Sequence, residues 1–120
     1  MVKVLKMEEA PLEMRPTGSV RRVVNEGIGA SRLGVILVEI SAGAAPPGFH
    51  YHTKRESVYI GVEGRAKATI DGREYIVEPD TVVLISPGEK HRLENIGDVP
   101  FKMIEVYSPI EPDRVEVPEE

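Results

Sequence analysis

The chain has 120 residues, a net charge of −5 and no cysteine, with 41% apolar and 29% charged residues. This length suits one domain, the missing cysteines exclude a disulfide framework, and an acidic chain without a basic patch is not expected to bind nucleic acid. No apolar run approaches the roughly 20 residues that span a bilayer. We therefore expect a small cytoplasmic protein with no nucleic-acid partner and no membrane partner.

The first 32 residues predict an arm of short strands. Residues 2–5 and 21–24 are short β-prone segments, and Pro11 and Pro16 exclude a helix between them. Residues 25–29 contain two glycines and predict a turn.

Most of the remaining chain consists of short β-prone runs separated by turn signals. The clearest hairpin has Asp71-Gly72 between two alternating segments, which is typical of a two-residue type I′ turn. The predicted core strands span 33–40, 57–63, 65–70, 73–77, 81–85, 90–95 and 101–107. Since no segment keeps a 3.6-residue apolar period, the pattern predicts an all-β sandwich or barrel.

The last twelve residues, 109–120, hold three prolines and five acids, which predict an extended or frayed tail. We expect one domain over residues 1–120. It divides into the arm (1–32), the barrel core (33–108) and the acidic tail (109–120).

Two of the three histidines, His50 and His52, stand two positions apart. In a strand they point to the same face, because side chains alternate. The third, His91, follows the turn Ser86-Pro87-Gly88, and Glu56 lies four residues after His52. A strand histidine is more often a surface or hydrogen-bonded residue than a ligand. The gathering of all the histidines in one candidate cluster nevertheless favours a divalent metal site.

The residues around these histidines resemble the cupin family. The first cupin motif corresponds to Gly43, His50, His52, Glu56 and Gly64. The second corresponds to Pro87, Gly88, His91 and Asn95. The resemblance covers residues 33–109. It implies a double-stranded β-helix (jelly-roll) barrel and a metal held by His50, His52, His91 and Glu56.

One part of that ligand set stays open. Leaving three residues between His52 and the acid places Glu56 in the acid position of the motif, whereas leaving six residues between the acid and Gly64 places Ser57 there. A one-residue difference decides which face of a strand a side chain occupies. Three histidines alone, with water completing the coordination, suit Fe, Mn, Ni, Zn or Cu.

Several other residues have two readings each. Phe49, Tyr59 and Met103 line the pocket in one reading and fill the core in the other. Arg55, Arg65 and Arg92 either steer an anionic substrate or are simply solvated. No catalytic residue is assigned.

The resemblance implies a range of functions, because a fold does not fix a reaction. Our first hypothesis is a mononuclear metalloenzyme of the dioxygenase/oxidoreductase or isomerase type that acts on a small molecule. The alternative is a non-catalytic cupin that senses or stores a small molecule. A third reading treats the barrel only as a dimerisation module. We expect a homodimer, because unpaired sheet edges are usually covered.

Overall fold

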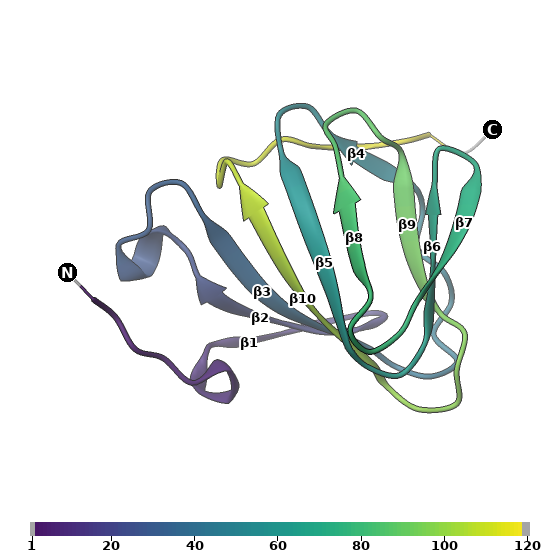
Figure 1. Ribbon diagram of the computed structural model, residues 1–120, viewed down its shortest axis with the longest axis horizontal. Helices are drawn as coiled ribbons and strands as arrows, with labels where there is room; N and C mark the ends of the chain where they lie inside the picture. Colours follow the sequence, from purple (N-terminus) through teal and green to yellow (C-terminus); the bar gives the residue numbers. More distant parts are fainter. Residues whose placement is uncertain (1, 119–120) are drawn as a thin grey trace.

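The computed structural model describes residues 2–118 as two facing β-sheets (Figure 1). One sheet has six strands, in the order β1 (Leu12–Arg15), β2 (Gly18–Val24), β3 (Gly34–Ile40), β10 (Phe101–Ser108), β5 (Glu56–Glu63) and β8 (Val82–Ile85). The other has five, in the order β11 (Arg114–Glu116), β4 (His50–His52), β9 (His91–Asn95), β6 (Ala66–Ile70) and β7 (Arg73–Val77).

The all-β prediction is confirmed. The strands of the described residues form two separate hydrogen-bonded sheets. The structure therefore resembles the predicted barrel, but its sheets are not joined into a closed one. The described helices are two single 3₁₀ turns, η1 (Met7–Glu9) and η2 (Glu26–Ile28), and neither has the length or apolarity needed to cross a membrane.

The hairpin between β6 and β7 forms as predicted. Asp71 and Gly72 have φ angles of 48° and 82°, and the strands pair from Ala66 with Val77 to Ile70 with Arg73. Positive φ at both central residues is the requirement of a type I′ turn.

The N-terminal arm differs from the prediction. Residues 2–5 form no strand, whereas Leu12–Arg15 forms β1 between the two prolines and pairs with β2. Leu12 and Met14 alternate with Glu13 and Arg15, but the alternation covers only four residues between two prolines, and all four side chains are exposed. β2 belongs to the core sheet, since Val20 and Val23 are buried.

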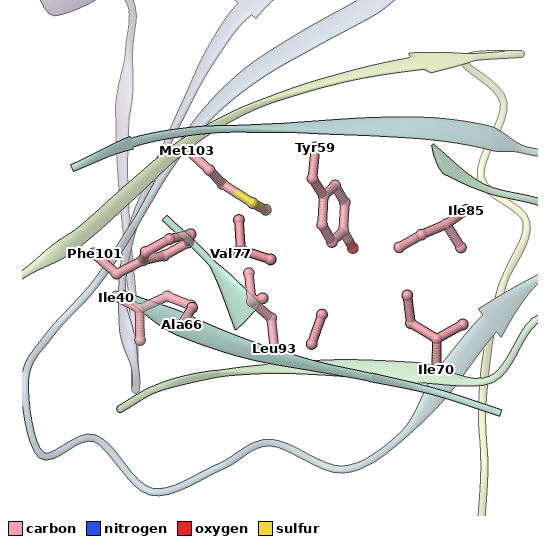
Figure 2. Close-up of a cluster of buried hydrophobic side chains, with 10 residues drawn as sticks. Ile40, Tyr59, Ala66, Ile70, Val77, Ile85, Leu93, Phe101 and Met103 are labelled. Carbon is pink, nitrogen blue, oxygen red and sulfur yellow. The ribbon is translucent and has the colours of Figure 1, made fainter. Parts of the chain in front are cut away.

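The core lies between the sheets and comes from alternate residues of each strand. On β10 the inward residues are Phe101, Met103, Glu105 and Tyr107, all buried. Figure 2 shows Phe101, Ile40 and Ala66 gathered at one end of the cluster, with Ile70 and Ile85 at the other. The hydroxyl of Tyr59 points toward the second end.

The C-terminal segment runs across one end of the molecule (yellow in Figure 1). Residues of this segment form a strand at the edge of the five-stranded sheet. This strand, β11, pairs with β4, so that Arg114 lies opposite His52, Val115 opposite Tyr51 and Glu116 opposite His50. The tail is therefore extended over residues 114–116 and is joined there to the strand that carries two of the histidines, while residues 119–120 lie outside the described part of the chain.

Candidate metal centre

The three histidines converge on the inner face of the five-stranded sheet. His50 and His52 lie on β4, and His91, the first residue of β9, pairs directly with His50. The ring centroids are 4.2 Å apart for His50 and His91, 5.3 Å for His50 and His52, and 5.9 Å for His52 and His91. One nitrogen from each ring lies within 4.8 Å of the others. Among the described residues this is the group that has the spacing for a shared metal ion.

A carboxylate from the tail holds the His52 ring. His52 Nδ1 lies 2.7 Å from Asp113 Oδ1, and the Asp113 side chain is only 6% exposed. Asp113 Oδ2 accepts hydrogen bonds from the backbone amides of Lys54 (2.8 Å) and Arg55 (2.7 Å). Since a carboxylate accepts, the proton of the neutral imidazole stays on Nδ1 and the Nε2 lone pair is free. This carboxylate–histidine pair is the usual support of a metal-binding imidazole.

A backbone carbonyl holds the His91 ring in the same way. Nδ1 of His91 donates to the carbonyl of Glu89 at 2.8 Å, which again leaves Nε2 free. The loop before His91 is fixed at two points. The amide of Gly88 donates to the carbonyl of His52 at 2.8 Å, and Asp71 exchanges two hydrogen bonds with the backbone of Lys90.

His50 has no such support. Its Nδ1 is buried without a hydrogen-bond partner in the described part of the chain. Burial, together with the neighbouring His91 and Arg114, lowers the pKa of His50 to about 3. Burial also lowers the pKa of His52 and of His91, and the hydrogen bonds to Asp113 and Glu89 oppose only part of that shift. All three imidazoles are therefore neutral near pH 7, which is the form that binds metal.

The alternation of β5 gives Glu56 and Ser57 different surroundings. Glu56 is exposed at the start of the strand, and Ser57 is buried with only 3% exposure. The structure thus brings Ser57 to the inner face and leaves Glu56 outside the histidine group. Ser57 Oγ donates to Glu105 Oε2 at 3.0 Å.

Glu105 is a buried acid that the sequence reasoning missed. It is 8% exposed, and it lies on β10 directly opposite Tyr59 of β5, so both side chains occupy the inner face. Burial raises the pKa of Glu105, while the hydrogen bond from Ser57 opposes part of the shift. The sequence does indicate that Glu105 faces inward, because it alternates in step with the apolar residues Phe101, Met103 and Tyr107.

Asp113 was missed for a different reason. It stands in a tail with prolines and several acids, and no local pattern distinguishes it from Glu111 or Glu116. Only the pairing of β11 with β4 brings it to His52.

The three predicted pocket residues lie in different surroundings. Tyr59 is buried, with its ring centroid 6.3 Å from that of His91. Met103 is buried in the apolar cluster, toward Phe101 in Figure 2. Phe49 is half-buried beneath the guanidinium of Arg92, whose Cζ lies 4.5 Å from the ring centroid.

Comparison with known protein families agrees with this geometry. The family model described as "Cupin domain" matches residues 36–107, a span that includes all three histidines.

Two curated relatives match different shares of the chain. The tetracenomycin polyketide synthase protein TcmJ of Streptomyces glaucescens is 28% identical over 99 residues, which is 82% of this chain and 66% of that protein. Glucose-6-phosphate isomerase of Pyrococcus furiosus is 35% identical over 65 residues, 48% of this chain and 34% of that protein. The matched region thus spans less than two thirds of either relative.

A solved structure shares the whole fold. The polyketide cyclase RemF of Streptomyces resistomycificus superposes with a TM-score of 0.83 over 100% of this chain and 88% of its own, at 21% identity. At this identity the likeness concerns the fold alone.

Proposed function

The chain belongs to the cupin family, and we propose that it is a mononuclear metal-binding cupin that acts on a small molecule. The observation that carries the proposal is the group of three neutral imidazoles with donor atoms within 4.8 Å of one another. Two of the rings are held by Asp113 and the Glu89 carbonyl so that Nε2 faces away from these partners. The buried, unpartnered Nδ1 of His50 is a polar atom that a ligand would satisfy.

The donor set suits Fe, Mn, Ni, Zn or Cu, since imidazole is a good ligand for each. His50, His52 and His91 would hold the ion, and Asp113 would orient the His52 ring. When bound, such an ion polarises an oxygen of the substrate and stabilises negative charge on it.

Of the two reaction types, the isomerase type has the better support. Moving a hydrogen between neighbouring carbons needs a group that gives and takes a proton. Glu105 is a buried carboxyl on the inner face, beside Ser57 and opposite Tyr59. The similarity to a glucose-6-phosphate isomerase agrees with this class. In this proposal Glu105 transfers the proton, while the apolar residues around Tyr59 exclude water.

Metal analysis tests the first part of the proposal. Protein purified without a nickel column is loaded with each candidate ion, dialysed and analysed for bound metal. We expect about one ion per chain for the wild type and almost none for His91→Ala. Leu93→Ala is the matched control, because Leu93 is two residues along β9 on the same buried face. A wild type that retains no ion, or a Leu93→Ala variant that loses it equally, would overturn the proposed site.

Two further measurements separate the reaction types. Oxygen uptake by the Fe-loaded protein with catechols or 2-oxo acids would indicate an oxidoreductase. Deuterium exchange from solvent into a sugar phosphate would indicate an isomerase, and Glu105→Gln should abolish it. A ligand that raises the unfolding midpoint without any turnover would indicate a binding protein instead.

We also propose a homodimer, which the outer face of the six-stranded sheet supports. Six apolar side chains pair there across three strands: Val58, Ile60, Val82, Leu84, Ile104 and Val106. Val82 and Leu84 are 63% and 59% exposed, although contiguous apolar surface is usually covered. Light scattering should give twice the 13.3 kDa mass of the chain, and Leu84→Asp should give the single mass. A monomeric wild type would contradict the proposal.

A further inference from the structure

We propose that this site selects small anionic oxygen ligands of the 2-hydroxy or 2-oxo carboxylate class, and that Arg114 and Arg55 are the residues that select them. The inference rests on the proposed metal site and adds the class of substrate to it.

Arg114 is the first of the two cations. It lies on β11 directly opposite His52 on β4, so its side chain leaves the sheet on the same side as the histidines. Its side chain is 48% exposed, and its Nε bonds to Glu116 Oε1 at 2.6 Å. This register places Arg114 beside the histidine pair, at the edge of the proposed site.

Arg55 is the second cation and comes from the turn before β5. Its Cζ lies 3.9 Å from the ring centroid of the buried Tyr107, and its side chain is only 16% exposed. The nearest acid, Asp113, has Oδ1 3.8 Å from Arg55 Nε, beyond hydrogen-bond distance. Both Asp113 oxygens already accept hydrogen bonds from His52 and from the amides of Lys54 and Arg55. Within residues 2–118, Arg55 Nε is buried with no hydrogen-bond partner.

The charge balance of the site then favours an anion. A divalent ion on three neutral imidazoles keeps both of its positive charges, because Glu56 is exposed and outside the group. Glu105 is the nearest buried acid on the facing sheet, and its raised pKa favours the uncharged form. The guanidinium of Arg114 is paired with Glu116, and that of Arg55 lies near Asp113, so the charge that remains to be compensated is that of the ion. A neutral ligand would leave the excess positive charge uncompensated in a partly buried site.

The geometry of a carboxylate matches these donors. A 2-hydroxy or 2-oxo acid offers one carboxylate oxygen and its neighbouring oxygen to a metal, and its second carboxylate oxygen to a guanidinium. Arginine binds carboxylates through paired N–H groups in a planar fork. Arg114 Nε donates a hydrogen bond to Glu116 Oε1, and a bound carboxylate would compete with Glu116 for this guanidinium.

Ligand titration of the Co(II)-loaded protein tests the inference. Glycolate and its neutral amide, glycolamide, have nearly the same shape and differ in charge. Each is titrated while the visible spectrum of the cobalt is recorded, which reports binding without any turnover. We expect glycolate to bind the wild type at least about tenfold more tightly than glycolamide, the ratio typical of one charge-assisted hydrogen bond.

The variants identify the residues. Arg114→Gln and Arg55→Gln should each weaken glycolate binding by about tenfold and leave glycolamide binding unchanged. Arg55→Lys, which keeps the charge, controls for the packing of Arg55 on Tyr107 and should bind glycolate more tightly than Arg55→Gln. Arg65→Gln is the matched control, since Arg65 is exposed and paired with Glu78, and it should behave as the wild type.

The outcomes are distinct. Equal affinity for glycolate and glycolamide, or equal weakening of both by Arg114→Gln, would overturn the inference while the metal site stands. Failure of the wild type to bind Co(II) would overturn the proposed metal site itself.

Discussion

The two ends of the space between the sheets are completed differently, and the histidine end is the more exposed of the two. At one end Phe101 and Val77 are fully buried among apolar neighbours, and the protein fills the space itself. At the other end lie the histidines. Of the buried side-chain atoms without a hydrogen-bond partner in the described chain, His50 Nδ1 and Arg55 Nε belong to that end, whereas Arg92 Nε lies over Phe49 on the other face of β9. Because native proteins satisfy buried polar groups, this difference supports the proposal of a bound metal at the histidine end.

Removing Phe101 should have the largest effect on the apolar end. Phe101→Ala should lower the free energy of unfolding by about 3–5 kcal/mol, because it leaves a cavity in a fully buried cluster. Urea denaturation of the metal-free protein measures this. Val62→Ala, at a 46% exposed position on β5, serves as the control. If Phe101→Ala also abolished metal binding by the remaining folded protein, the two ends would not be independent.

Removing Asp113 should act on the histidine end. Asp113→Ala should weaken metal binding by about 10- to 100-fold, because the His52 ring loses the acceptor that orients it. Competition with a chelator of known affinity measures the change. Glu111→Ala, an exposed acid two residues earlier, should have no effect. Equal losses in both variants would show that only the charge of the tail matters.

Acid should lower the stability of the metal-free protein through the buried His50 of the histidine end. In the folded state His50 has a pKa of about 3, whereas an unfolded histidine titrates near 6.5. Below about pH 6.5 the unfolded chain therefore binds more protons than the folded one, so stability falls as the pH falls and continues to fall toward about pH 3. The unfolding midpoint of the metal-free protein should drop between about pH 7 and pH 5.5. The drop should be smaller in His50→Gln, and an identical drop in both would contradict the assignment.

The smallest effects should distinguish Glu56 from Ser57. Glu56→Gln should leave metal affinity and stability unchanged, because the side chain is exposed. Ser57→Ala removes the hydrogen bond to Glu105 and should cost about 1–2 kcal/mol of stability. Denaturation and metal titration of both variants measure these effects. A loss of metal affinity in Glu56→Gln would indicate that Glu56 turns inward when metal binds.

The features that depend on residues close together in the sequence could be predicted from the sequence. Alternation and turn residues predicted the core strands and the Asp71-Gly72 hairpin, and the motif spacing predicted that the three histidines converge. Spacing alone did not choose between Glu56 and Ser57, because that choice depends on how the turn after His52 delivers the chain to β5.

The supporting residues depend on long-range contacts. Asp113 meets His52 across 61 positions and Glu105 meets Ser57 across 48. No local period encodes such pairings, which arise from the order of strands in each sheet. Glu105 differs from Asp113 because the alternation along β10 already places it on the apolar face.

The side chains of Ser57 and Glu105 meet between the two sheets. Their side chains lie 3.0 Å apart on neighbouring strands, so an acid can face the interior from either β5 or β10 without any shift of the backbone. Two charged acids at this distance repel, and one of them would have to stay protonated. A single carboxyl group, carried either by β5 or by β10, therefore suits this place between the sheets better than two.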